Sequence, residues 1–209
     1  MLLAFDTATP HVTVALHDGE AVVASFESEE AMRHGEMLAP AIERVLAEAG
    51  ARAADLDAIA VGVGPGPFTG LRVGLVTART MAFALDIPLH GVCSLDILAA
   101  AAIDAGLDEF VVATDARRKE VYLASYARGR RVSGPEVVKP ADARKDLPVI
   151  GRGGRLYPEY FAKVTGPEHP SAAVLCDIVV NERFELLEPN PLYLRRPDAA
   201  EPGKPKRVG

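Results

Sequence analysis

The feature that most constrains the fold is a pattern of strand-like segments that occurs twice in the chain. In its first copy, the apolar run Leu2–Phe5 ends at Asp6, and two more apolar or alternating runs follow at Val12–Leu16 and Ala21–Phe26. The last two runs flank Asp18-Gly19, and an Asp-Gly pair between apolar runs is a strong hairpin signal. We therefore predict that the chain opens with three strands, the second and third antiparallel.

The second copy begins near residue 110. Phe110–Thr114 is apolar and ends at Asp115, Glu120–Tyr126 alternates, and Arg131–Val138 follows a turn at Arg128-Gly129. The similarity lies in the pattern of elements and not in residue identity, as in many repeat architectures. It predicts two similar lobes in which Asp6 and Asp115 occupy equivalent strand ends.

Helical and strand patterns follow each of the two hairpins. After the first we expect a helix, a strand, a helix, a strand and a helix, over Met32–Ala49, Ala58–Val63, Phe68–Leu85, Pro88–Val92 and Leu95–Ala105. After the second we expect a helix, a strand and a helix, over Pro140–Lys145, Pro148–Ile150 and Leu156–Val164. The predicted fold class is α/β with duplicated β-β-β-α-β units, an N-terminal lobe over 1–104 and a reduced C-terminal lobe over 105–195. Residues 196–209 lack periodicity and are rich in Pro, Gly and charge, which predicts a disordered tail.

Charge is distributed unevenly between the halves of the chain. Residues 1–115 carry 5 basic and 17 acidic side chains, whereas residues 116–209 carry 18 and 12. We therefore do not expect the first half to bind nucleic acid by itself, because contacts with phosphate need Lys and Arg side chains. The second half holds a basic cluster that is either a solvated face or a contact for RNA or an acidic protein, made of Arg117, Arg118, Lys119, Arg128, Arg130 and Arg131.

Membrane, secretory and metal-binding classes find no support in the residues. No apolar run reaches the roughly 18 residues of a membrane span, and the start lacks the basic region of a signal peptide. Cys93 and Cys176 form no CxxC motif, and no two of the five histidines stand four apart. We expect a cytoplasmic protein with two reduced core thiols, no metal site and no membrane contact.

The densest motif is Gly64-Pro65-Gly66-Pro67-Phe68-Thr69-Gly70-Leu71-Arg72-Val73-Gly74. Glycines between a strand and a helix let backbone amides approach an anion, but the spacing matches neither G-x-x-x-x-G-K-[ST] nor G-x-G-x-x-G. Thr69 has no nucleophile-elbow context, so a helix-capping role is favoured over a nucleophilic one.

The helix expected at Phe68–Leu85 is apolar nearly all round, which is typical of a helix buried on every side. Gly70, Gly74, Ala78 and Ala82 form a stripe of small residues that would let another helix approach closely. We predict that the stripe meets another subunit; the alternative is that Met32–Ala49 covers it within the chain. The predicted partner interface comprises His34, Met37, Leu38, Gly70, Leu71, Gly74, Leu75, Ala78, Met81 and Ala82.

These residues carry a resemblance to the TsaB (YeaZ) family, the small partner in bacterial synthesis of threonylcarbamoyladenosine in tRNA. The most specific match is the Gly64–Gly74 block. Supporting matches span roughly residues 1–195: Asp6-Thr7-Ala8-Thr9, Arg33-His34-Gly35-Glu36-Met37-Leu38 with Pro40, Gly91-Val92-Cys93-Ser94-Leu95, Asp115-Ala116-Arg117 with Glu120-Val121-Tyr122, and Pro191-Leu192-Tyr193-Leu194-Arg195. Family members usually carry Ser where this chain has Gly35 and Pro67, which argues against a hydroxyl role at those positions.

The resemblance implies a two-lobed actin-like ATPase (ribonuclease H-like) fold whose nucleotide machinery has decayed. Active relatives need a glycine two residues after each strand-end aspartate, where this chain has Ala8 and Arg117. The implied role is a non-catalytic scaffold with no catalytic residue, cofactor or metal of its own, and the vestigial phosphate-loop positions are Asp6, Thr7, Thr9 and Asp115. The implied partners are the transferase TsaD and the ATPase TsaE, with a homodimer when alone, tRNA contact only through the complex, and a nucleotide at a subunit interface left open.

Two other functions remain as alternatives. One is an active metal-dependent kinase or glycoprotease-like enzyme of the same fold, against which Ala8, Arg117 and the absence of a histidine pair argue. The other is an autonomous tRNA-binding module, which rests on the basic cluster alone.

Overall fold

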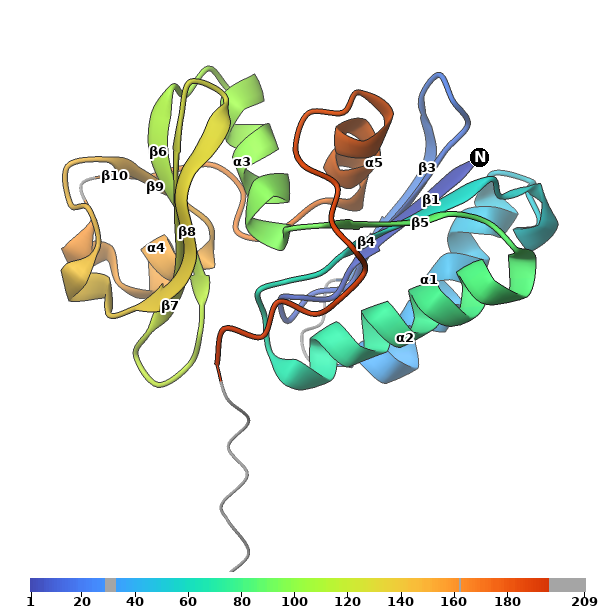
Figure 1. The fold of residues 1–209 in the computed structure, drawn as a ribbon, viewed down its shortest axis with the longest axis horizontal. Helices are drawn as coiled ribbons and strands as arrows, with labels where there is room; N and C mark the ends of the chain where they lie inside the picture. The colour runs from blue at the N-terminus through green and yellow to red at the C-terminus, as the bar shows by residue number, and fades with distance from the viewer. Residues whose placement is uncertain (29–32, 162, 196–209) are drawn as a thin grey trace, which may run out of the picture.

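The computed structural model describes residues 1–28, 33–161 and 163–195 as two lobes, each built on its own sheet (Figure 1). The first sheet contains β1 (Leu2–Asp6), β2 (Thr13–His17), β3 (Val22–Glu27), β4 (Ala58–Gly62) and β5 (Leu89–Val92) in the order β3-β2-β1-β4-β5. β1 pairs antiparallel with β2 and parallel with β4, and β2 pairs antiparallel with β3. The predicted opening of three strands with an antiparallel hairpin is confirmed.

The second sheet repeats this topology. It contains β6 (Glu109–Asp115), β7 (Val121–Ala127), β8 (Arg130–Val138), β9 (Pro148–Ile150) and β10 (Lys163–Val164) in the order β10-β9-β6-β7-β8, which is the first order read from the other edge. β6 is antiparallel to β7 and parallel to β9, as β1 is to β2 and β4. The predicted duplication is therefore confirmed, with Asp6 and Asp115 at matching strand ends.

Helices differ in size between the lobes. The first lobe has α1 (His34–Glu48) and α2 (Phe68–Leu85), whereas the second has only a 3-10 turn at Pro140–Asp142 and the short α4 (Arg152–Leu156) in the corresponding places. Leu3 and Phe5 of β1 pack with α1 and α2 in one apolar core, on one face of the first sheet. The second lobe is thus smaller because its helices are shorter than those of the first lobe.

The last helix of each repeat lies between the two sheets (Figure 1). α3 (Ser94–Asp104) follows the first sheet, yet Leu95, Leu98 and Ala102 belong to a core with Phe110 and Tyr126 of the second. α5 (Ala172–Val180) follows the second sheet but packs on β1 and β2 of the first. The two repeats therefore exchange helices, and α5, at residues 172–180, covers the first sheet although it falls inside the range predicted for the second lobe.

Two predicted elements of the second repeat need correction. The helix expected at Pro140–Lys145 is only the 3-10 turn, and the described residues of the range Leu156–Val164 hold the end of α4, a 3-10 turn at Pro158–Tyr160 and β10 in place of the expected helix. α4 instead ends at Leu156, because Pro158 has no amide hydrogen and forces Tyr157 out of helical backbone. β10 and α5 were not predicted, and the expected disordered tail (196–209) and Met32 lie outside the described residues.

No helix in the described part of the chain is both long and apolar enough to cross a membrane.

Candidate functional site

The end of β1 forms a buried polar turn around Asp6. The side chain is fully buried, its Oδ2 accepts a hydrogen bond from Ser94 Oγ at 2.5 Å, and its Oδ1 accepts one from the Ala8 amide at 2.8 Å. Burial raises the pKa of Asp6, against the opposing effects of these hydrogen bonds. A Cβ on Gly62 of β4 would stand 1.7 Å from Asp6 Oδ2. Only glycine therefore leaves room for the carboxylate.

The other residues of the β1 turn hold the two long helices. Thr7 Oγ1 donates to the Gly70 carbonyl at 2.8 Å, and His34 Nε2 lies 2.6 Å from the Thr9 carbonyl oxygen. A Cβ on Gly74 would lie 2.4 Å from Thr7 Oγ1. Three of the four predicted phosphate-loop positions, Asp6, Thr7 and Thr9, are thus buried anchors for α3, α2 and α1.

The end of β6 forms the same turn around Asp115, but near the surface. The Arg117 amide donates to Asp115 Oδ1 at 2.8 Å, which reproduces the Ala8 to Asp6 bond, and the Arg117 guanidinium lies 3.5 Å from Asp115 Oδ2. The Asp115 side chain remains 18% exposed. Arg117, Arg118 and Lys119 follow with φ of 63°, 52° and 60°, a left-handed conformation that is costly for residues other than glycine.

The two turns face each other across Gly66 and Pro67. Tyr122 of β7 directs its hydroxyl to the Gly66 carbonyl at 3.4 Å, and a Cβ on Gly66 would stand 2.3 Å from the Ala8 carbonyl oxygen. An open cleft of about 200 Å³ lies beside this contact and is lined by Gly66, Pro67, Phe68, Asp115, Ala116, Arg117, Arg118, Tyr122, Tyr193, Leu194 and Arg195. The Gly-rich motif therefore fills the space beside the first turn and leaves a cleft beside the second.

A C-terminal segment, which we call the strap (Leu187–Arg195), closes one side of this cleft. Leu187 pairs with Gly91 of β5, and the Leu192 amide donates to the Val63 carbonyl at 2.9 Å. Arg195 then donates to the Ala116 carbonyl at 2.8 Å and forms an ion pair with Glu120. The strap runs from the first lobe to the second, past the N-terminal end of α2 (Figure 1).

The predicted partner interface is wrong in its central element. The stripe of Gly70, Gly74, Ala78 and Ala82 is buried within this chain, where α2 packs on the β1 turn and on α1. His34, Leu38, Leu71 and Leu75 are buried too, and Met37 and Met81 are partly so. Small residues permit a close helix approach, and here the approaching groups belong to the same chain.

Other residues that the sequence pattern did not single out are exposed on α2. Phe83 is 90% exposed and Val76 60%, and Arg72 and Arg79 share this outward side. Arg79 reaches the strap at the Pro189 carbonyl and Asn190, at 2.6 and 2.7 Å. An outward apolar face on a helix assumed to be buried all round could not be identified from periodicity alone.

A histidine pair was also missed. The rings of His11 and His169 lie 3.9 Å apart, and burial, with His11 and Arg152 adding to it, lowers the pKa of His169 to about 4. Within the described residues, no group of three or more His, Cys, Asp or Glu side chains could hold a metal ion. Both cysteines are buried free thiols, and burial raises the pKa of each to about 12.

Comparison with known proteins gives concordant results. A family described as "TsaD: tRNA N6-adenosine threonylcarbamoyltransferase" matches residues 26–160. An uncharacterised protein of Mycobacterium tuberculosis is 43% identical over 202 residues, covering 95% of this chain and 93% of that protein. The "tRNA threonylcarbamoyladenosine biosynthesis protein TsaB" of Haemophilus influenzae is 33% identical over 222 residues, covering 93% of each chain.

Solved structures agree with the sequence relatives. "YeaZ from Pseudomonas aeruginosa" superposes with a TM-score of 0.76 at 33% identity, covering 92% of this chain and 99% of that one. The two sheets of identical topology and the exchanged helices are consistent with the predicted actin-like, ribonuclease H-like fold. On this evidence, the chain belongs to the TsaB (YeaZ) family.

Proposed function

We propose that this protein acts in the formation of threonylcarbamoyladenosine in tRNA, as a subunit that binds TsaD and has no catalytic activity of its own. The observation that carries the proposal is the identity of 33–38% to proteins named for this biosynthesis in three bacteria. The TsaD-like match over residues 26–160 fits a subunit derived from the transferase itself. Such a subunit works with tRNA in the cytoplasm.

The geometry of the two strand-end turns supports the absence of catalysis. Phosphate transfer in this fold needs open space beside the aspartates, yet Asp6 is fully buried and bonded to Ser94 and the Ala8 amide. The Gly66 backbone packs against Ala8, so no phosphate fits there. At Asp115 the Arg117 side chain supplies the cation that a bound metal would supply in an active relative.

The partner surface that we propose is the outward face of α2, made of Arg72, Val76, Arg79 and Phe83. An aromatic side chain that is 90% exposed gains about 1.5–3 kcal/mol when a partner covers it. Exposed apolar side chains grouped on one helix are typical of protein contacts. TsaD and a second copy of this chain would compete for this face, while TsaE joins the assembled complex.

Reconstitution tests the proposal. The chain alone is expected to give no threonylcarbamoyl transfer. With threonylcarbamoyl-AMP supplied as donor, its addition to the cognate TsaD and TsaE is expected to restore transfer to unmodified tRNA, with release of AMP. Turnover by the dialysed chain alone, as ATPase, kinase or protease, that is lost in Asp6→Asn or Asp115→Asn would overturn the scaffold function in favour of the enzyme alternative.

The Phe83→Glu variant tests the partner surface. It should stay folded, because the side chain is exposed, yet weaken TsaD binding and self-association at least tenfold by placing a charge in an apolar contact. Val132→Glu is the matched control, since Val132 is 58% exposed on β8 of the other lobe. Binding affinity from calorimetry and mass from light scattering give the readouts, and equal TsaD binding by the two variants would move the interface away from α2.

A further inference from the structure

The cleft beside Asp115 brings together aromatic and cationic side chains that the proposed TsaD contact does not use. Phe68, Tyr122 and Tyr193 line it with Arg117, Arg118 and Arg195. Phe68 stands 15 residues before Phe83 on α2, about 22 Å along the helix axis. The cleft therefore lies at the other end of α2 from Phe83, and Arg72 is the residue at which the outward α2 face borders it.

Two aromatic side chains and one cation of the cleft and its border are already in contact. The Arg72 guanidinium carbon lies 3.8 Å from the centre of the Phe68 ring, and the Phe68 and Tyr193 rings are tilted by 33° with their centres 5.3 Å apart. Tyr193 is 42% exposed, and the strap that carries it is bonded to β5, α2 and the β6–β7 turn. A planar ligand would pack on an aromatic ring that is already held in place, which reduces the entropy lost on binding.

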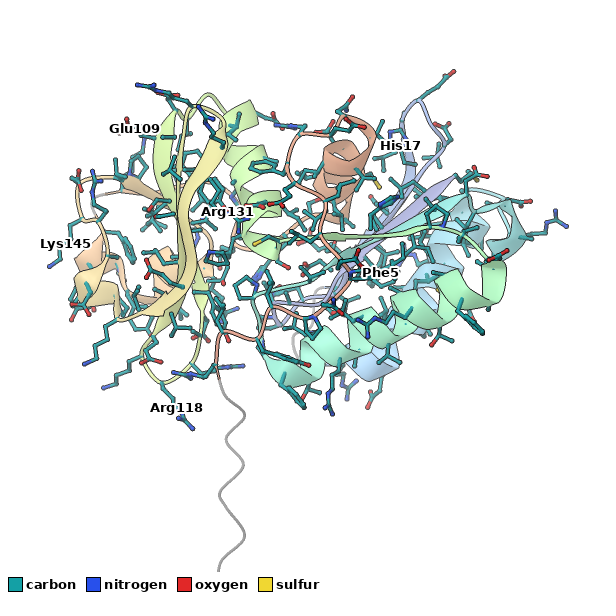
Figure 2. The ribbon with its side chains drawn as sticks, in the orientation of Figure 1. Phe5, His17, Glu109, Arg118, Arg131 and Lys145 are labelled. Atoms are coloured by element: carbon teal, nitrogen blue, oxygen red, sulfur yellow. The ribbon has the colours of Figure 1, made fainter. Side chains whose placement is uncertain are left out.

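Two of the three cationic side chains of the cleft, Arg117 and Arg118, come from the β6–β7 turn, where Lys119 follows them, and all three residues of this turn are exposed. Their left-handed backbone is a conformation for which glycine or asparagine is favoured. Strained positions of this kind cluster at functional sites. Figure 2 shows Arg118 extending from this turn, away from the body of the second lobe.

We propose that this cleft binds a single-stranded segment of RNA, with one base on Tyr193 and the flanking phosphates on Arg117 and Arg118. Stacking on an exposed aromatic ring beside a row of cations is the arrangement by which single strands are held without regard to sequence. Asp115 and Glu120 stand beside the cations and oppose a compact triphosphate more than a chain whose phosphates are spread along the turn. The choice of RNA over DNA rests on the proposed function in tRNA modification.

Fluorescence anisotropy with a labelled oligo(U) of about ten nucleotides at low salt tests the proposal, since single-strand sites span roughly 4–16 nucleotides. Tyr193→Ala should weaken binding at least fivefold, because stacking contributes about 1–3 kcal/mol per base. Tyr193→Phe keeps the ring and should bind within twofold of the wild type. Arg118→Glu should weaken binding and flatten the salt dependence, by about 0.7 in the logarithmic slope for each phosphate that the protein no longer neutralises.

Arg128→Glu is the matched charge control. Arg128 is exposed just beyond the opposite end of β7, whose seven residues span about 23 Å at 3.3 Å per residue, and its variant should bind almost as the wild type does. If Arg118→Glu and Arg128→Glu weaken RNA binding equally, the loss of affinity reflects the overall charge of the protein, and the proposed site is wrong. Competition by AMP at the affinity of the oligonucleotide would also overturn the site, because it would assign the cleft to free nucleotides.

RNA binding at the cleft and TsaD binding at α2 can be tested independently, although the choice of RNA rests on the proposed function. Tyr193→Ala should still bind TsaD, because Tyr193 lies at the other end of α2 from Phe83. Loss of RNA binding with TsaD binding retained supports the cleft, and RNA binding unchanged in Tyr193→Ala overturns it whatever TsaD binding shows.

Discussion

The turns after β1 and β6 share one backbone design but have diverged in their surroundings. In each, the aspartate accepts a 2.8 Å bond from the amide two residues on. Around Asp6 the turn is sealed by Ser94, Gly62 and Gly66, whereas around Asp115 it opens on a cleft and continues into three left-handed basic residues. The comparison teaches that a duplicated element can keep its hydrogen bonds while one copy becomes core and the other remains surface.

Gly62→Ala should produce the largest effect on this comparison. The new Cβ would stand 1.7 Å from Asp6 Oδ2 and displace the carboxylate from Ser94. We expect a loss of more than about 3 kcal/mol in the free energy of unfolding, as for severe overpacking with a broken buried hydrogen bond. Urea denaturation measures it.

Gly35→Ala is the control for that substitution. A Cβ at Gly35 meets nothing within 4 Å, and alanine in a helix is favoured by about 0.5–1 kcal/mol over glycine. If Gly62→Ala lowers the free energy of unfolding no more than Gly35→Ala does, then the Asp6 turn is not sealed.

The pH dependence of Asp6→Asn gives an intermediate effect. Burial raises the folded pKa of Asp6 above the ordinary 3.8, so the folded state holds this proton more tightly than the unfolded state. That contribution is full below pH 3.8 and is lost as pH rises through the folded pKa. Asn carries no such proton, so the unfolding free energy of the variant relative to the wild type should rise with pH from about 4 upward.

Denaturation curves at several pH values between about 3.5 and 8 measure this difference. Asp115→Asn serves for comparison, because its carboxyl is partly exposed and forms no bond to Ser94. A flat difference for Asp6→Asn would contradict the buried, proton-retaining state of Asp6.

The smallest expected effect is the change in unfolding free energy when the residue two positions after each aspartate is replaced by glycine, and its sign should differ between the two turns. Arg117→Gly places glycine at φ of 63° and should stabilise the fold by about 0.5–1 kcal/mol. Ala8→Gly loses a buried methyl at a position that is not left-handed and should destabilise it by a similar amount. Thermal unfolding checks both, and the same sign in both would mean that the turns have not diverged in backbone strain.

Strand positions and the duplication could be predicted because their signals are local. Apolar runs ending at Asp6 and Asp115, and the Asp18-Gly19 turn, locate the strands without knowledge of their neighbours. Phe68–Leu85 was predicted with the bounds of α2 itself. These elements carry enough periodicity to identify their type.

The sequence did not indicate which segment packs on each helix face, because that depends on residues that are distant in sequence. The small-residue stripe from Gly70 to Ala82 is equally compatible with a subunit interface or with internal packing. It packs internally because it contacts the β1 turn, where Thr7, 63 residues before Gly70, donates a hydrogen bond to the Gly70 carbonyl. α5 carries a single charged residue, Asp177, in nine, so its pattern gave little indication of the buried face, and Pro158 ended α4 where the apolar spacing continued. The aromatic contact between Phe68 and Tyr193 joins residues that are far apart in the chain, so no local pattern indicated it.

The exchange of α3 and α5 has a consequence for synthesis on the ribosome. The strands of the first sheet are complete at Val92, but the helix that covers Leu2, Ala4 and Ala60 begins only at Ala172. At roughly 5–20 residues per second, this apolar face waits several seconds for its cover. During synthesis the N-terminal repeat therefore exposes an apolar sheet face that the finished structure hides, and aggregation of the nascent chain is expected to begin at this face.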